Sequence, residues 1–597
     1  MKPERILDVE CFVNWFLIGF TDVATRTHLD LQWPIDAARV RQVFAESTIV
    51  TFNGWKYDVP MIVLALSGAD QRTLKQASDS IIQWNLQPWQ FYERNGLTDP
   101  TDTIDHIDLI EVAPGIASLK TYGGRLGSRK LQDLPFPHDH WLSDDDKRTG
   151  TLYCQNDRLT TIDLLEAVRP QLALRERVGA EYGLDLRSKS DAQMAEAIMR
   201  HAAGRYVERP VYALGSLIHY TAPDWVQFQT PGLQRALYVA QTSPFTVVEK
   251  ENKKTDDGEL RTALEMHPDL ATMQITIARN AYRMGMGGIH SSESCVWQRE
   301  DAGHILSDFD VASYYPRLIL NLGIEPPQLR GVFRPTYQGW VDRRLAAKAA
   351  GDKVIADAFK VVVNGTFGKL GSKWSVMYHP ESMVRVTLTG QLALLMLIEA
   401  FELSGIAVVS ANTDGIVVRC PRHLVHVRDT VIRQWSARTS LELEETIYRT
   451  IYSRDVNNYI AVKPDGKVKT KGAYADEGLS KNPTTLVCLD AVRAYLTAGT
   501  PLQDTIAACT DVRRFVSIRK VDGGAVWQGQ PIGKTVRWFY GANASAAIHY
   551  AESGKTVSDT EGAIPVLELP DSLPSNIDHM WYLRKAVKML TELGVRY

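Results

Sequence analysis

The sequence is poor in cysteine, and its six cysteines form no CxxC pair. The paired thiols that hold zinc or an iron–sulfur cluster are therefore missing, and so few cysteines suit a reducing compartment. The opening residues MKPERILDVECF lack the apolar stretch and cleavage site of a signal peptide. These absences lead us to expect a cytoplasmic protein without a structural metal cluster.

Long apolar runs and a strong net charge are also missing. The run LALLMLIEAF (392–401) is too short to span a bilayer and predicts a core helix, so we expect no membrane contact. The formal net charge is only −3, which by itself does not indicate nucleic-acid binding. Any such binding would need local basic patches.

The chain itself has 597 residues, too many for one hydrophobic core, so several domains are expected. Strand-like and helix-like stretches alternate over the first 170 residues: a strand pair at 6–22, a strand at 47–54 and a helix at 153–168. Residues 303–420 read as a strand, two helices and a hairpin. Such alternation predicts an α/β layout for the first part of the chain.

A first set of acids lies in this N-terminal part. Asp8 and Glu10 occupy positions i and i+2 of a predicted strand and so share one face. Asp58 follows an apolar run, and Tyr153 and Asp157 are one helical turn apart. Each acid alone could be a solvated surface group. Together they could hold two metal ions about 4 Å apart, which activate water for phosphodiester hydrolysis.

A second pair of acids lies in the middle of the chain. The stretch HILSDFDVASYYPRLIL predicts a strand that ends at Asp310 and a helix that begins near Pro316. We expect the backbone N–H groups of residues 311–314 to be free for phosphate. The stretch VVSANTDGIVVRC predicts a hairpin with Asp414 at its tip, although Asp-Gly is also a common turn pair. Two aspartates at strand ends suit two-metal phosphoryl transfer.

Between these acids, AFKVVVNGTFGKLG places Lys360, Asn364 and Phe367 on one helix face. A lysine there can bind a triphosphate, and an aromatic ring can stack on a base pair. Lys348 and Lys353 extend the basic character upstream. The alternative is an amphipathic helix with a solvated lysine.

These short sequence stretches resemble the motifs of family B DNA polymerases. DVASYYP, KVVVNGTFG and SANTDGI resemble polymerase motifs A, B and C, the N-terminal acids resemble the three DEDDy-type exonuclease motifs, and KTKGAY (469–474) resembles the primer-binding motif. The six catalytic motifs occur in the family's order. The resemblance implies an α/β and α+β multidomain fold, with an RNase H-like exonuclease domain followed by a right-hand polymerase of palm, fingers and thumb.

The resemblance also implies domain boundaries. We expect an exonuclease domain at 1–175, a connecting segment and first palm part at 176–335, fingers at 336–380, a second palm part at 381–455, and a thumb and C-terminal region at 456–597.

The roles implied for the polymerase half begin with metal binding by Asp310, Val311 and Asp414. Tyr315 would be the steric gate against a ribose 2′-hydroxyl. The residues that would bind the nucleotide are Ser313, Tyr314, Tyr315, Lys348, Lys360, Asn364 and Phe367. The residues that would hold the primer strand are Lys469, Lys471 and Tyr474.

In the exonuclease half, the implied metal ligands are Asp8, Glu10, Asp58 and Asp157, with Tyr153 orienting the water. Ser118 and Leu119 would contact single-stranded DNA. The cofactor would be Mg²⁺, with Mn²⁺ as an alternative, two ions in each active site. Primer-template DNA, dNTPs and a helicase or other replisome protein would be the partners of a monomeric enzyme in the cytoplasm of a phage-infected host.

Several residues depart from the family pattern. Asn412 stands where motif C usually has its first aspartate, Gly365 replaces a serine, and Phe367 replaces a tyrosine. A nuclease with a degenerate polymerase half is therefore an alternative. A protein-primed replicase is another, but only 50 residues separate Asp310 from Lys360, which leaves no room for the protein-priming insertion. With Asp8 so near the start of the sequence, we also expect no extra N-terminal domain.

Overall fold

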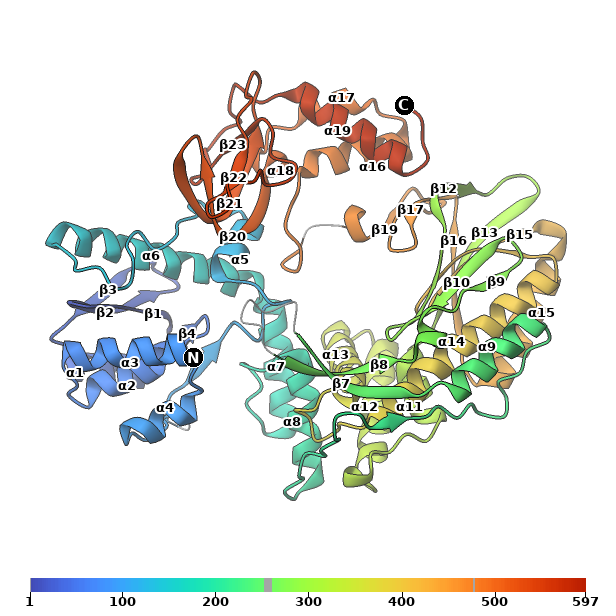
Figure 1. Cartoon of the computed structure of the whole chain (residues 1–597), viewed down its shortest axis with the longest axis horizontal. Helices are drawn as coiled ribbons and strands as arrows, with labels where there is room; N and C mark the ends of the chain where they lie inside the picture. The colour runs from blue at the N-terminus through green and yellow to red at the C-terminus, as the bar shows by residue number, and fades with distance from the viewer. Residues whose placement is uncertain (1, 102, 252–259, 476–477) are drawn as a thin grey trace. The chain divides into compact units, whose positions relative to one another are not determined.

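The computed structural model describes residues 2–101, 103–251, 260–475 and 478–597 (Figure 1). The chain folds into two compact units, and each unit is assembled from several segments of the chain. The first unit contains Met1–Ser190, Glu477–Ala491 and Pro501–Leu583, and the second contains Asp191–Asp476, Val492–Thr500 and Arg584–Tyr597. All six cysteines are free thiols. The protein is thus a mixed α/β chain of more than one domain.

The first unit is built on a five-stranded sheet of order β3-β2-β1-β4-β5. Its strands are β1 (Glu4–Phe12), β2 (Trp15–Asp22), β3 (His28–Gln32), β4 (Thr48–Thr51) and β5 (His106–Asp108). β1 pairs antiparallel with β2 and parallel with β4. The expected strand pair at 6–22 is confirmed.

Helices cover both faces of this sheet (Figure 1). The helices of this region are α1 (Ala37–Glu46), α2 (Asp58–Leu66), α3 (Gln71–Trp84), α4 (Pro88–Asn95), α5 (Leu119–Leu126), α6 (Asp144–Ala167) and α7 (Arg169–Tyr182). α2 and α3 pack on one face of β1 and α6 packs on the other, whereas α4 packs on α2 and α7 follows α6. α6 begins at a capping box of Ser143 and Asp146, which satisfies its first free N–H groups. Its inner face packs on the sheet through Ile162 and Leu165, which share a core with Ile6 of β1.

The C-terminal part of the first unit is a four-stranded sheet of order β22-β20-β21-β23 with short helices. Its elements are α17 (Leu502–Ala508), α18 (Val512–Phe515), β20 (Ser517–Trp527), β21 (Gln530–Tyr540), β22 (Ile548–Tyr550) and β23 (Ala563–Pro565). The helices α16 (Leu486–Ala498) and α19 (His579–Glu592) are each divided between the two units. The Leu131 N–H donates to the Leu567 carbonyl oxygen at 2.8 Å, and the buried Arg537 donates to the carbonyl of Ser128 at 2.8 Å. These bonds join the sheet to the N-terminal domain.

The expected domain boundaries stay a prediction, although their positions can be compared with the helices and with the two units. The boundary after residue 175 falls inside α7, and the segment 456–597 is divided between the two units. The boundary after residue 335 falls inside α12 (Phe333–Ala350). Helix α13 (Lys353–Leu370), which follows α12, matches the helix expected around 358–371.

The second unit is built on a seven-stranded sheet of order β16-β13-β15-β14-β11-β10-β9. Its strands are β9 (Ile275–Ile277), β10 (Asn280–Met284), β11 (Ile289–Ser291), β13 (His304–Val311), β14 (Ala407–Asn412), β15 (Gly415–Pro421) and β16 (Leu443–Tyr448). The hairpin expected at 408–420 is confirmed, because β14 pairs antiparallel with β15 and residues 413 and 414 form its turn. The end of β13 thus lies beside the start of its antiparallel neighbour β15.

Helix α14 (Pro380–Leu403) is longer than the apolar run noticed in the sequence. Its length and hydropathy would allow it to cross a membrane, but 83% of its most apolar window is buried within the protein. The Trp435 indole N–H, from α15 (Val425–Thr439), donates to the Ala393 carbonyl oxygen of α14 at 2.7 Å. The expectation of a core helix is confirmed, although the helix is longer than the apolar run that predicted it.

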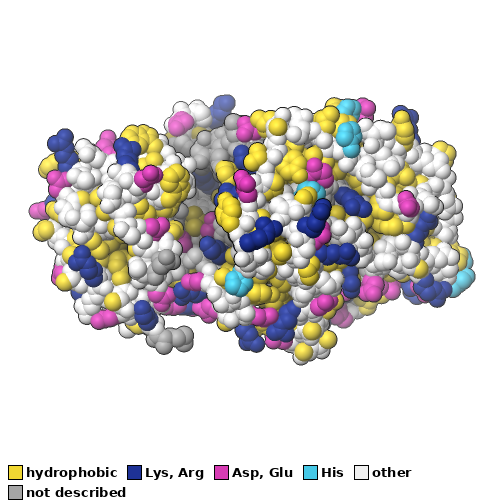
Figure 2. Space-filling model, turned by 90° about the horizontal axis from the view of Figure 1, so that it is seen from below, with side chains coloured by type: hydrophobic (Ala, Val, Ile, Leu, Met, Phe, Trp, Pro, Cys, Tyr) yellow, Lys and Arg dark blue, Asp and Glu magenta, His cyan; other side chains and the backbone are white. Residues whose placement is uncertain are grey.

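The sequence offered no account of residues 205–280. Apart from β9 and the first residue of β10 in the seven-stranded sheet, the described residues of this range form smaller elements of the second unit. They include β6 (Leu217–Ile218), α9 (Pro231–Thr242), α10 (Pro268–Ala271) and the antiparallel strands β7 (Phe245–Glu251) and β8 (Leu260–Met266). A further sheet of order β12-β17-β18-β19 contains β12 (Ser294–Arg299), β17 (Thr450–Asp455), β18 (Asn458–Val462) and β19 (Val468–Lys471). On the face drawn in Figure 2, basic and acidic side chains are interspersed, in keeping with the small net charge.

Candidate active sites

The first candidate site lies on strand β1 of the first unit. Asp8 and Glu10 point to the same side of the strand, and their carboxylate oxygens and the Cys154 sulfur all lie within 4.8 Å of one another. Asp58, the first residue of α2, accepts a hydrogen bond from the Val9 N–H at 2.8 Å, which fixes this third carboxylate against β1 between the other two. The structure therefore brings Asp58, which lies 49 residues from Val9 in the sequence, to the neighbouring pair Asp8 and Glu10.

Helix α6 supplies the remaining two members of this site. Tyr153 and Asp157 are both buried, with 7% exposure each, and lie on the face of α6 that covers β1. The Lys120 ammonium forms an ion pair with Asp157 and lies 4.3 Å from the centre of the Tyr153 ring. Lys120 was missed in the sequence, although it directly follows the Ser118-Leu119 pair that was singled out.

Ser118 and Leu119 lie at the start of α5, where one caps the helix and the other packs against the core. Ser118 caps α5, where its side chain accepts a hydrogen bond from the Thr121 N–H, and it remains exposed. Leu119 is half-buried and packs against the core shared by β1 and α6. An exposed cap beside Lys120 still leaves Ser118 able to meet a DNA strand, which stays a prediction.

The acids of this site raise one another's pKa. Burial raises the pKa of Asp8 to about 6, with a further contribution from the Asp157 charge. Burial and the Asp8 charge raise the pKa values of Glu10 and Asp58 as well. Burial also raises the pKa of Asp157, although the Lys120 ammonium opposes the shift. A crowded group of oxygen donors of one sign fits hard divalent cations such as Mg²⁺.

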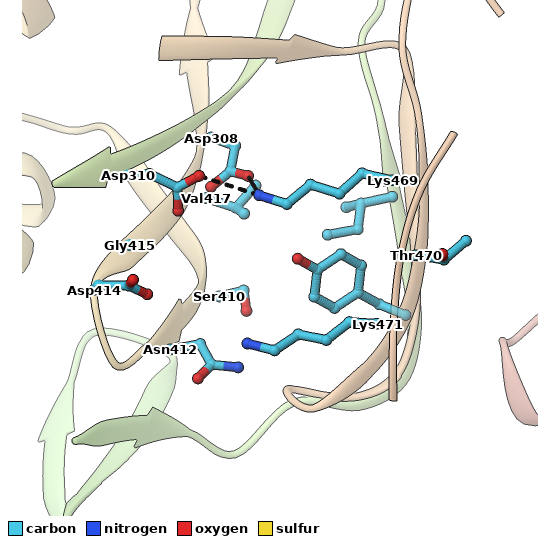
Figure 3. Close-up of a pocket in the computed structure, with 12 residues that line it drawn as sticks. Asp308, Asp310, Ser410, Asn412, Asp414, Gly415, Val417, Lys469, Thr470 and Lys471 are labelled. Carbon is cyan, nitrogen blue, oxygen red and sulfur yellow. Dashed lines mark hydrogen bonds and ion pairs between the residues drawn. The ribbon is translucent and has the colours of Figure 1, made fainter. Parts of the chain in front are cut away.

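The second candidate site lies at the ends of β13 and β15 in the second unit (Figure 3). Asp310 pairs with Gly415 across the two strands, and the Val311 N–H donates to the Asp414 carbonyl oxygen at 2.8 Å. A side chain at position 415 would displace the Asp310 carboxylate, so glycine leaves this carboxylate in its place. Asp310 and Asp414 thus converge on one open cavity of about 400 Å³.

The expectation that the backbone N–H groups of residues 311–314 are free to bind phosphate is wrong for two of these residues. Besides the bond from Val311, the Ala312 N–H donates to the Glu442 carbonyl oxygen at 2.9 Å, so the backbone donors of both residues are already used. Ser313 adopts a left-handed backbone with φ of 52°, and its hydroxyl accepts a hydrogen bond from Arg344 at 2.7 Å. Arg344, one turn before Lys348 on α12, brings to this strand end a cation that the sequence analysis missed.

A lysine links two acids inside the cavity. The Lys469 nitrogen lies 2.9 Å from Asp308 Oδ2 and 3.1 Å from Asp310 Oδ2 (Figure 3). Asp308 is 5% exposed and also accepts a hydrogen bond from the Tyr448 hydroxyl. Its position two residues before Asp310, on the same strand face, was the sequence signal that could have identified it.

The charges in the cavity also shift one another's pKa. Burial and the Asp310 charge raise the pKa values of Asp308 and Asp414. Burial would lower the pKa of Lys469, but the Asp308 carboxylate and its neighbours raise it overall. Burial lowers the pKa of Lys471, which lines the same cavity. The cavity therefore combines oxygen ligands suited to Mg²⁺ with two lysines suited to a polyanion.

Three expected nucleotide-binding residues lie on the exposed face of α13. Lys360 and Asn364 are exposed, and Phe367 is half-buried. The Phe367 ring stacks on Tyr315, and the Tyr315 hydroxyl donates to the Gly287 carbonyl oxygen at 2.7 Å. Lys348 forms an exposed ion pair with Glu444 at 3.4 Å. The expectation that Lys360, Asn364 and Phe367 share one face of a helix is confirmed.

Two side chains do not occupy their expected positions. Tyr314 is 4% exposed and its hydroxyl donates to the Gly390 carbonyl oxygen of α14, so its side chain belongs to the core and not to a nucleotide site. Tyr474 is 1% exposed, so its side chain cannot contact a primer strand in this structure. Lys469 and Lys471 both line the open cavity, and Lys469 is paired there with Asp308 and Asp310, so their contact with a DNA backbone stays a prediction.

Comparisons with known proteins give short matches. No family model matches the chain. Over 124 residues the chain is 27% identical to DNA polymerase 1 of Sulfurisphaera ohwakuensis, and over 122 residues it is 28% identical to DNA polymerase 1 of Saccharolobus solfataricus. Each match covers 20% of this chain and 14% of the relative's length.

A solved structure, the family B DNA polymerase of the archaeon Pyrobaculum calidifontis, aligns with 100% of this chain and 78% of its own. The TM-score is 0.39 and the sequence identity 14%.

Proposed function

We propose that the protein is a template-directed DNA polymerase that extends a DNA or RNA primer and proofreads with a 3′–5′ exonuclease in its first unit. The observation that carries the proposal is the convergence of Asp310 and Asp414 on a cavity that also holds Lys469 and Lys471. The local sequence similarity to two archaeal DNA polymerases supports it. The intact pair of acids disfavours a degenerate polymerase half.

The polymerase reaction would be attack of the primer 3′-hydroxyl on the α-phosphorus of a dNTP, with pyrophosphate as the leaving group. Asp310, Asp414 and the Val311 carbonyl would hold two Mg²⁺ ions, which when bound lower the pKa of the hydroxyl and neutralise the phosphates. Arg344 and Lys348 on α12 and Lys360 on α13 would bind the triphosphate. Lys471 lies where it can balance the charge of the primer backbone.

Nucleotide choice would depend on the stacked pair of Tyr315 and Phe367. The hydrogen bond to the Gly287 carbonyl holds the Tyr315 hydroxyl in place, and stacking on Phe367 holds the Tyr315 ring. The Tyr315 side chain therefore has little freedom to rotate. A fixed ring beside the sugar would exclude a ribose 2′-hydroxyl.

In the exonuclease, Asp8, Glu10, Asp58 and Asp157 would hold the metal ions that supply a nucleophilic water. The Tyr153 hydroxyl would orient that water, and Lys120 would stabilise charge that develops on the phosphate. Lys120 already contacts both Asp157 and the Tyr153 ring, which supports this role.

The proposal extends to the setting that the resemblance implies. The protein would act as a monomeric replicase of phage type in the host cytoplasm, next to a helicase.

The test is dNTP incorporation on a primed template by the wild-type chain and by Asp310→Asn. We expect incorporation by the wild type and a loss of at least about a thousandfold in the variant, because one of two metal-binding carboxylates is neutralised. A wild type that incorporates nothing would exclude the polymerase.

The exonuclease has its own test. Asp8→Ala should abolish degradation of single-stranded DNA and leave extension intact, whereas Asp22→Ala on the neighbouring strand should change neither. Loss of both activities in Asp8→Ala would contradict the assignment of one activity to each unit.

A further inference from the structure

Asn412 occupies the position where the related motif has an aspartate, and its surroundings show that an amide is needed there. This inference rests on the proposed polymerase function. We propose that Asn412 is a positioning residue that ties the catalytic hairpin to the strands carrying Lys469 and Lys471. Its departure from the motif is then an adaptation of this chain and not a sign of decay.

The first argument is the set of hydrogen bonds that the side chain makes. Asn412 Nδ2 donates to the Val456 carbonyl oxygen at 2.8 Å and to Asn457 Oδ1 at 3.2 Å. Its Oδ1 accepts a hydrogen bond from the Thr413 hydroxyl at 3.0 Å. In Figure 3 the amide nitrogen points away from Asp414, toward the side of the cavity formed by Lys471. Asn412 therefore faces the turn between β17 and β18.

The second argument is what this turn supports. The Asn457 N–H donates to Asp455 Oδ1 at 2.9 Å, which fixes the turn locally. Asn458 Oδ1 accepts a hydrogen bond from the Ala473 N–H at 2.7 Å, and Tyr459 pairs with Lys471 between β18 and β19. The turn is thus bonded to the same short segment that carries the two cavity lysines.

The third argument is that the backbone at position 412 is held from the opposite side as well. His290 of β11 pairs with Asn412, and the Thr413 N–H donates to the Ile289 carbonyl oxygen at 2.9 Å. Thr413 has a left-handed backbone with φ of 57°. Asn412 is thus fixed between β11 and the turn, one residue from the tip that presents Asp414.

An aspartate could not make the same contacts. Val456 presents a carbonyl oxygen and Asn457 its amide oxygen, so both partners are acceptors and need a donor. A carboxylate offers acceptors only, and would face these oxygens with a negative charge. We therefore expect Asn412→Asp, although it restores the motif, to separate the hairpin from the β18–β19 strands.

The experiment compares the full chain with Asn412→Asp, Asn412→Ala and Asn457→Ala. The matched control is Asn321→Asp, which removes a similar amide bond to the Ser440 carbonyl of the same unit. For both Asn412 variants we expect the dissociation constant for primer-template to rise about tenfold, as for the loss of one or two partly buried hydrogen bonds. KM for dNTP should stay within about twofold, because the triphosphate site is not touched. Asn457→Ala should weaken binding by a smaller factor, because the bond to Val456 persists.

Degradation of single-stranded DNA and the melting temperature show whether each variant is folded. If Asn412→Asp binds primer-template and extends it as well as the wild type while the wild type is active, the inference is overturned and the proposed function stands. An equal rise in KM for dNTP would also overturn it, because it would indicate general damage to the cavity. If the wild type incorporates no nucleotide, both the inference and the proposed function fail.

Discussion

Tyr315 and Phe367 lie face to face, with ring centroids 4.2 Å apart and planes inclined by 1°. One ring comes from α11 (Tyr314–Asn321) and the other from α13, so the contact joins two helices that begin 39 residues apart in the chain. Phe367→Ala should free the Tyr315 ring and reduce discrimination against ribonucleotides by up to about tenfold, the value of an aromatic pair. The ratio of dNTP to rNTP incorporation measures this. Phe367→Tyr preserves the stacking and should behave as the wild type, and equal discrimination by the alanine variant would contradict the role of the pair.

Lys469→Ala removes the cation that Asp308 and Asp310 share. Because Asp308 keeps the Tyr448 hydroxyl as a partner, we expect a moderate loss of about 1–3 kcal/mol in the free energy of unfolding, measured by urea denaturation. Primer extension should fall more steeply than stability, since the lysine lies in the cavity. Lys467→Ala is the matched control, because Lys467 pairs only with the exposed Asp465 among the ion pairs of the described chain. If both substitutions change stability and primer extension equally, the ion pairs of Lys469 with Asp308 and Asp310 have no particular importance.

Mg²⁺ should stabilise the chain more at neutral pH than in mild acid. The pKa of Asp8 is raised to about 6 from its ordinary value of 3.8, so the folded protein binds more protons than the unfolded chain in this range. Without metal, the free energy of unfolding therefore falls by the contribution of this carboxyl as the pH rises from about 4 to 6. A bound cation offsets the repulsion that remains above pH 6.

Differential scanning calorimetry of the full chain in EDTA and in Mg²⁺, at pH 5 and pH 7, measures this effect. We expect the rise in melting temperature caused by Mg²⁺ to be larger at pH 7. In the variant Asp8→Asn/Glu10→Gln the difference between the two pH values should shrink. A Mg²⁺ effect that is independent of pH would refute the explanation.

Gly365 provides a test of the packing behind the nucleotide face. A Cβ at this position would lie 2.9 Å from the Asp191 carbonyl oxygen of α8 (Asp191–Ala203), so α8 and α13 approach too closely for a larger residue. Gly365→Ala should destabilise the protein by about 1–3 kcal/mol, and Gly365→Ser, which restores the family motif, should do no better. Gly368→Ala on the same helix meets nothing within 4 Å and should be neutral or stabilising. Urea unfolding of the three variants decides the point.

The sequence allowed prediction of those parts of the sites that lie within single elements. Asp8 and Glu10 share a strand face, and Lys360, Asn364 and Phe367 share a helix face, because strand and helix periods fix these relations. Two apolar runs on either side of turn-forming residues also predicted the hairpin that presents Asp414. None of these needed a contact between distant segments.

What the sequence could not provide was the pairing of distant residues. Lys469 contacts Asp308, which lies 161 residues away in the sequence, and no local sequence pattern predicts such a contact. Tyr314 was misassigned because adjacent helix residues point in different directions, and only the packing on α14 decides which one is buried. The close fit that explains Gly365 likewise depends on α8, far away in the sequence.

The division of the first unit among three segments governs how the chain can fold during its synthesis. Residues Glu477–Ala491 and Pro501–Leu583 leave the ribosome only after nearly all of the second unit has emerged. The hydrogen bond from Arg537 to the Ser128 carbonyl can therefore form only after the second unit's main segment has been synthesised. A polypeptide that stops short of residue 501 would lack Arg537 and the sheet that carries it, so such a truncation would also remove part of the first unit.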